Sequence, residues 1–126
     1  MPITYEIDAP RGRIHTTCFG VVTLPQVMAH FDALQRDPGR PARLDVLLDL
    51  TDIQTPPQAP QIRAVADRVG FLEDLVFGAC AIVADREVVF GMARMFEVVA
   101  RGHFAAIRTF RRLAEAERWL DSGADV

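Results

Sequence analysis

The apolar run at residues 75–84, which leads into a helical segment ending near Arg101, constrains the fold of this chain most strongly. The run reads LVFGACAIVA and shows no alternation of apolar and polar side chains, which is typical of a strand covered on both faces. We therefore predict a central strand here, in a sheet with helices on both sides. This unit carries no catalytic signature, so it says more about the fold than about the function.

The segment that follows this strand is predicted to be a helix. Asp85 precedes it, and an aspartate there can accept a hydrogen bond from a free backbone N–H, so we expect Asp85 to cap the helix. Gly102 is expected to end it. Apolar residues recur at three- and four-residue spacing and form the stripe that we expect to face the core. This stripe consists of Val88, Met92, Met95, Phe96 and Val99.

The rest of the chain predicts four more strands and three more helices. Strands are expected over residues 3–8, 13–19, 44–50 and 105–110, and the outer helices over residues 24–36 and 113–120. Thr23 is expected to cap the first helix, because a threonine side chain accepts from a backbone N–H of the first turn. The middle helix carries the stripe Ile62, Val65, Val69 and Leu72, is weakened in its middle by Gly70, and leaves Phe71 and Leu75 partly exposed.

This order of elements predicts the fold class. Strands that alternate with helices form right-handed crossovers onto a parallel sheet, whereas the first strand pairs antiparallel through its hairpin and belongs at an edge. We predict one α/β domain over residues 1–126, with a five-stranded mixed sheet and four helices. A chain of 126 residues leaves no room for a second domain.

Composition excludes several classes of function. The net charge of −3 argues against nucleic-acid binding, because phosphate contacts require a basic surface. All basic residues are arginines, which indicates a GC-rich genome and excludes mechanisms that need a lysine amine. We predict that Cys18 and Cys80 are reduced core residues, with a disulfide between them as the alternative. Glu6 and Asp8 lie where a signal peptide would need an apolar segment. No apolar run approaches the length of about 20 residues that a membrane-spanning helix needs, so we expect a cytoplasmic protein.

The chain resembles the STAS superfamily, the fold of the anti-sigma-factor antagonists, and within it the bacterial STAS-like small proteins. The resemblance covers nearly the whole chain. It depends on the strand order, on LDVLLDL and ACAIVAD leading into helices, and on the ending RTFRRLAEAERWL. It implies a protein-binding switch that acts without catalysis, as a homodimer or with a protein partner.

Some members of this superfamily are controlled by phosphorylation in an Asp-Ser-Ser-Gly-like loop before the second helix. The corresponding loop here, residues 51–57, reads TDIQTPP and lacks that motif. Thr51 and Thr55 are the hydroxyl residues of this loop, and we assign no phosphorylation site to either.

Aspartates at strand ends and histidines are the candidate catalytic groups of this chain. Asp49 and Asp52 flank the exit of the strand predicted over residues 44–50, and Asp85 follows the strand predicted over residues 75–84. Carboxylates at strand ends can hold Mg²⁺. A magnesium-dependent enzyme is therefore a weaker alternative, although a phosphoacceptor domain would also need a lysine. The three histidines, His15, His30 and His103, show no paired spacing. We expect no enzyme activity, no bound cofactor and no metal ion.

Phenylalanine and methionine residues gather around the last two crossovers. The first explanation is that they fill the core, and the alternative is that they form one of two kinds of site. A pocket for a small apolar ligand or a lipid, as in the lipid-binding relatives of this group, would use Met92, Met95 and Phe96. A dimer or partner surface would use Phe71, Phe90 and Val98, if these side chains are exposed. The leading hypothesis is a STAS-like protein-interaction module, with apolar-ligand binding as the alternative.

Overall fold

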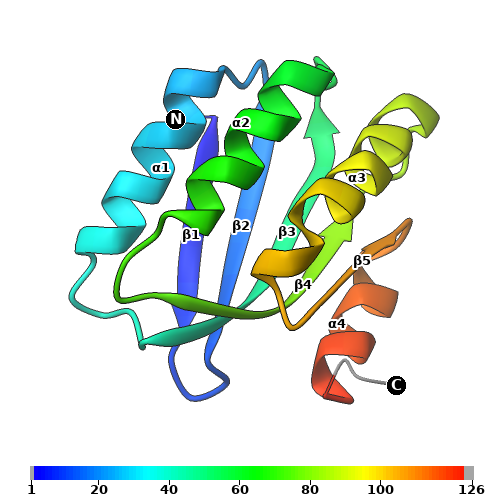
Figure 1. Cartoon of the computed structure of the whole chain (residues 1–126). Helices are drawn as coiled ribbons and strands as arrows, with labels where there is room; N and C mark the ends of the chain where they lie inside the picture. The colour runs from blue at the N-terminus through cyan, green and yellow to red at the C-terminus, as the bar shows by residue number, and fades with distance from the viewer. Residues whose placement is uncertain (1, 124–126) are drawn as a thin grey trace.

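One mixed sheet organises the structure, a computed structural model that describes residues 2–123 (Figure 1). Its strands lie in the order β1-β2-β3-β4-β5. β1 pairs antiparallel with β2, and each later pair is parallel. The predicted α/β fold, with an N-terminal hairpin at the sheet edge, is confirmed. The strands are β1 (Ile3–Asp8), β2 (Arg13–Gly20), β3 (Arg43–Ile53), β4 (Val76–Val83) and β5 (Ala106–Phe110).

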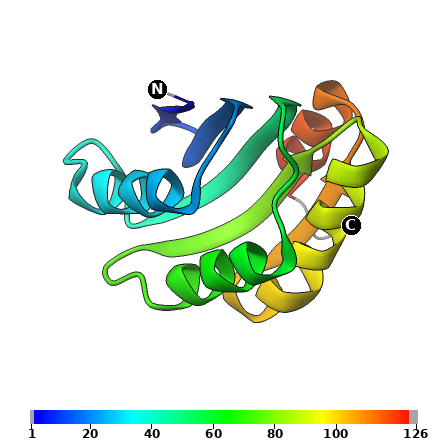
Figure 2. The same cartoon turned by 90° about the horizontal axis from the view of Figure 1, so that it is seen from above.

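The helices cover the two faces of the sheet unequally. α1, α2 and α3 lie on one face, and α4 lies on the other, over β3, β4 and β5 (Figure 2). The strand order explains this, since right-handed crossovers that all step in one direction place their helices on the same face. The helices are α1 (Leu24–Arg36), α2 (Ala59–Gly70), α3 (Glu87–Ala100) and α4 (Leu113–Asp121), with a short 3-10 helix η1 (Arg101–His103) after α3.

β4 is the buried centre of the fold, as the apolar run predicts. Every residue from 77 to 84 is buried. Ala79, Ala81 and Val83 pack under α4, whereas Cys80 and Ile82 pack under α3. The strand therefore has helices on both faces, and this is why its sequence does not alternate.

α3 is rotated about its axis relative to the prediction. Its buried residues are Val89, Ala93 and Ala100, and Val88 and Met95 of the predicted stripe are exposed. The helix is apolar on two faces, so both stripes satisfy the helical period, and the small side chains Ala93 and Ala100 let the helix approach the sheet closely.

Both ends of α3 also differ from the prediction. Asp85 does not cap the helix, because Arg86 occupies the N-cap position and makes no side-chain cap hydrogen bond. The helix ends at Ala100, before Gly102.

Other element boundaries differ modestly from those predicted. β3 continues three residues further than predicted, to Ile53, so Asp52 lies within the strand and not after it. Gly70 is the last residue of α2 and does not weaken its middle. Leu75 is buried, contrary to the prediction of partial exposure. The cap by Thr23 is confirmed, because its hydroxyl accepts from the Gln26 N–H within a capping box.

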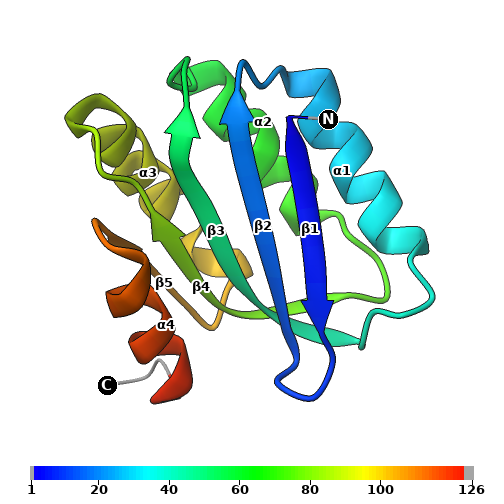
Figure 3. The same ribbon diagram turned by 180° about the vertical axis from the view of Figure 1, so that it is seen from behind.

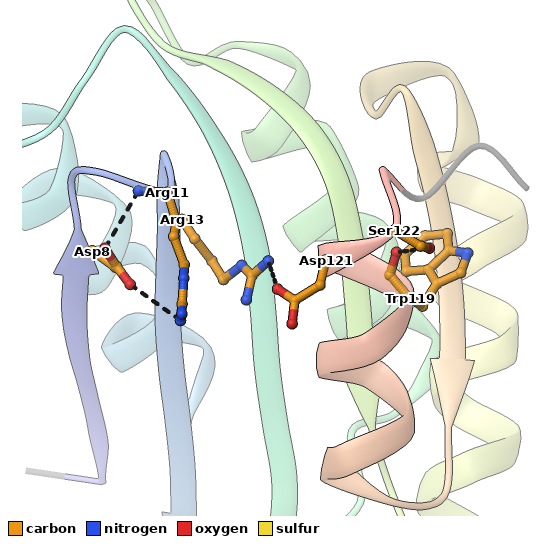
Figure 4. A network of polar contacts seen from close by, with 6 residues as sticks. All are labelled: Asp8, Arg11, Arg13, Trp119, Asp121 and Ser122. Atoms are coloured by element: carbon orange, nitrogen blue, oxygen red, sulfur yellow. Dashed lines mark hydrogen bonds and ion pairs between the residues drawn. The ribbon is translucent and has the colours of Figure 1, made fainter.

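On the α4 side of the sheet, no helix of the described residues 2–123 covers β1 and β2 (Figure 3). Arg13 of β2 reaches from this open half to the end of α4, where its Nη2 donates to Asp121 Oδ1 at 2.8 Å (Figure 4). The Arg13 side chain is nearly buried. The ion pair therefore links the last helix to the hairpin across a long stretch of sequence.

This link predicts a weak dependence of stability on acid pH. The hydrogen bond from Arg13 lowers the pKa of the Asp121 carboxyl below its ordinary value of 3.8. Because the folded-state pKa is the lower one, the stabilisation is present above 3.8 and is lost as the pH falls through the lowered value. Asp121→Asn should lower the urea midpoint at neutral pH, and the difference from wild type should shrink in acid. Equal differences at both pH values would contradict this.

Candidate functional site

An apolar cavity lies between the sheet and the layer formed by α1, α2 and α3. It contains about 180 Å³ of space. Four strands and three helices contribute side chains to its wall. Among the described residues that line it are Ile3, Thr16, Cys18, Val27, His30, Val46, Leu48, Leu50, Val65, Cys80, Met92, Ala93, Phe96 and Phe104.

The exposure of β3 shows how the cavity arises. Leu44, Val46, Leu48 and Leu50 all point toward the helices. Leu44 is fully buried where α1 and α2 pack on the sheet. Val46, Leu48 and Leu50 are only half-buried, although β3 is the middle strand of the sheet. The short side chains Thr16, Cys18, Val46 and Ala93 leave space that longer side chains would fill.

The cavity opens toward the carboxyl ends of β2 and β3. Of its described lining residues, Thr23 and Thr55 are exposed, and the others are buried or half-buried. Thr23 follows β2 and caps α1, and Thr55 lies in the proline-rich loop after β3. This is the edge at which ligands usually bind in open α/β sheets.

The polar groups in the wall are uncharged. The described lining residues include no Asp, Glu, Lys or Arg. Burial lowers the pKa of His30 to about 4, so its imidazole is neutral at pH 7. Its ring lies 5.4 Å from that of Tyr5 and 5.5 Å from that of Phe31, measured between ring centroids.

The two cysteines belong to the same wall. Both are free and buried, as predicted, and β3 lies between their strands, which rules out the alternative disulfide because the thiols are two strand spacings apart. Burial raises the pKa of Cys18 to about 11 and raises that of Cys80 as well. Both thiols are therefore protonated at neutral pH and unsuited to nucleophilic chemistry.

The predicted ligand-binding residues are divided between two sides of α3. Met92 and Phe96 line the cavity, whereas Met95 is 39% exposed on the outer side. Sequence reasoning missed His30 and the cysteines as wall residues. No local signal could have found them, since three separate elements bring them together.

The predicted interface residues differ in their exposure. Phe71 follows α2 and is 78% exposed, and Val98 of α3 is 66% exposed. Phe90 is half-buried near the start of α3, where the Arg111 guanidinium carbon lies 4.0 Å from its ring centroid.

The candidate metal ligands are not gathered. Asp49 Oδ1 accepts from the backbone N–H and the hydroxyl of Thr51, at 2.9 and 2.7 Å, whereas Asp52 and Asp85 are exposed. Within residues 2–123, no group of three or more His, Cys, Asp and Glu side chains is arranged to hold a metal ion.

The other two histidines lie apart from the cavity. His103 lies in η1 against Gly70. His15 lies on the open half of the sheet, beside Leu47 of β3.

Comparison with models of known protein families finds no match, and comparison with curated protein sequences finds none either. In the part of the chain that the structure describes, none of the helices is long and apolar enough to cross a membrane.

Proposed function

We propose that this protein binds a small uncharged apolar molecule, without converting it, in the cavity under α1, α2 and α3. One observation carries the proposal. The helix-facing side chains Val46, Leu48 and Leu50 of β3 are half-buried, although three helices cover this face of the sheet. Such side chains are normally packed to crystal density, so a guest molecule would complete the core.

The wall defines the chemical class of the ligand. A charged group inside would meet no opposite charge, and burying it would be costly. Neutral His30 and the hydroxyls at the mouth suit a hydroxyl or carbonyl group on an otherwise apolar body. The space exceeds that of a cavity of about 150 Å³ that takes up benzene, so a single ring or a short chain fits.

A cavity-filling variant tests this function. Val46→Phe should fill the space, so saturating toluene should raise the thermal midpoint of wild type but not that of the variant. The variant by itself should be at least as stable as wild type. Val76→Phe is the matched control, because Val76 is exposed at the start of β4 outside the cavity. A loss of about 1–3 kcal/mol in Val46→Phe, the usual effect of overpacking a full core, would contradict an empty cavity.

Native mass spectrometry of protein purified gently from its own host would then identify the natural ligand. We expect a discrete adduct that is lost on denaturation. Its mass would restrict the chemical class further.

We also propose a second function, as a STAS-like module that works through protein contacts. The order of strands and helices, with the N-terminal hairpin and three helices on one face, supports this relationship. The exposure of the apolar side chains Val88, Met95 and Val98 on α3 supports the contact function.

A further inference from the structure

Two polar side chains in the wall of the apolar cavity have no hydrogen-bond partner in the described chain. They are Thr16 of β2, which is 4% exposed, and His30 of α1, which is half-buried; we call them the inner pair. Among residues 2–123, neither side chain makes a hydrogen bond. Buried polar groups are nearly always paired, because an unpaired one loses its bonds to water and gains none. The inner pair therefore suits a partner that enters the cavity from outside.

The other polar groups of the wall are satisfied or exposed. The Thr23 hydroxyl donates to the Gln26 side-chain oxygen at 3.0 Å and accepts from the Gln26 N–H. The Gln61 side chain accepts from a backbone N–H at the start of α2, at 2.9 Å. Thr55 is exposed, so water can reach its hydroxyl. The cysteine thiols are only weak donors and acceptors.

The two members of the inner pair adjoin the same side chain. Tyr5 of β1 lies directly opposite Thr16 in the register of the hairpin, and residues opposed in this way have neighbouring side chains. The Tyr5 ring also lies 5.4 Å from the His30 ring, measured between centroids. The Tyr5 hydroxyl donates its proton to Asp37 Oδ2 at 2.7 Å. Thr16 and His30 are therefore close enough to contact one ligand group between them, and Tyr5 does not supply its proton to either.

The inner pair lies well inside the mouth of the cavity. Thr16 is four residues before Gly20, the last residue of β2, which is about 13 Å along a strand. His30 is seven residues after Thr23, which is about 10 Å along a helix. The wall nearer the mouth is mainly apolar and includes Val27 and Leu50. A ligand would thus place a polar group innermost and an apolar body toward the mouth.

We propose that the ligand of this cavity carries one hydroxyl group, bonded to Thr16 and His30, on an otherwise apolar body, as in a phenol or a short alcohol. This inference rests on the proposed ligand-binding function and specifies the ligand class. A threonine hydroxyl and a neutral imidazole can each donate and accept, and a ligand hydroxyl can meet either of them in either role. A carbonyl group can only accept, and a charged group would find no opposite charge among the described wall residues.

Two probes that differ by one hydroxyl group test this inference. p-Cresol is toluene with an added hydroxyl, and isothermal titration calorimetry measures the affinity of the wild-type protein for each. In a wholly apolar cavity the added hydroxyl would lose its bonds to water without replacement, so p-cresol would bind more weakly than toluene. We expect p-cresol to bind at least as tightly as toluene.

Substitutions of the inner pair locate the hydrogen bonds. Thr16→Val and His30→Phe replace each polar group by an apolar one of similar shape. Each should weaken p-cresol binding about tenfold, the effect of losing one buried hydrogen bond, and should leave toluene binding nearly unchanged. Thr17→Val is the matched control, because Thr17 is the next residue of β2 and points to the other face of the sheet, outside the cavity. It should bind both probes like wild type.

The outcomes separate this inference from the function on which it rests. If wild type binds toluene but binds p-cresol much more weakly, or if both variants bind p-cresol as tightly as wild type, the inference is overturned and apolar-ligand binding stands. No binding of either probe would count against both. NMR of the imidazole nitrogens in the wild-type protein gives a readout that does not depend on the variants folding. p-Cresol but not toluene should shift the signals of His30, and the absence of that shift would overturn the inference.

Discussion

Leu44→Ala should be among the most destabilising single substitutions in this chain, with a loss of about 2–5 kcal/mol of unfolding free energy. Leu44 is 0% exposed and packs in the cluster that contains Ile14, Leu34, Val69 and Phe77. Removing its side chain leaves a hole where α1 and α2 close tightly on the sheet. The cost of such a hole depends on how poorly the surrounding structure can collapse into it.

Leu48→Ala is the matched control for this prediction. Leu48 lies on the same strand and points to the same face, but it borders the cavity and is half-buried. Its side chain has fewer neighbours to lose, so the same substitution should cost clearly less. Urea unfolding of the two variants measures the difference. Equal costs would mean that the core is packed uniformly under the helices, and the ligand proposal would lose its main support.

Gly78→Ala and Gly91→Ala should change stability in opposite directions. At Gly78 in β4 an added Cβ would lie 2.5 Å from Arg43 Nη2 and closer still to Asp45 Oδ1. That oxygen accepts from the Ala79 N–H at 2.9 Å. Pushing Asp45 aside would leave this N–H without its partner, at a cost of about 1–3 kcal/mol.

Gly91 provides the contrast, because it lies inside α3 with open space around it. Alanine there should raise the stability by about 0.5–1 kcal/mol, since glycine loses more conformational freedom in a helix. Thermal unfolding of both variants and of wild type measures the two changes. A neutral or stabilising effect of Gly78→Ala would show that the hydrogen bond from the Ala79 N–H to Asp45 does not contribute to stability.

The fold was largely predictable because its signals are local. The unbroken apolar run of β4 requires cover on both faces, and the threonine with an early proline at α1 opens a helix whatever else surrounds it. The boundaries were less predictable than the elements themselves. β3 extends past its predicted end at Leu50, where Thr51 donates to the Asp49 carboxylate from its backbone N–H and its hydroxyl.

The candidate site was much less predictable. Met92 and Phe96 were expected to line a pocket and do so, but His30, Cys18 and Cys80 carry no pattern that links them. Their meeting depends on the distance at which α1 and α2 lie from the sheet. That distance follows from many side-chain volumes at once.

The sequence alone determined which segments are strands and helices, because hydrophobic period, caps and breakers act over a few residues. Tertiary structure alone decided the direction in which the strands are added, and therefore that three helices share one face while β1 and β2 stay open on the other. It also decided which of the two apolar stripes of α3 faces the sheet. The helical period allows both stripes, and only packing against the sheet buries Val89 and Ala93 while leaving Val88 and Met95 outside.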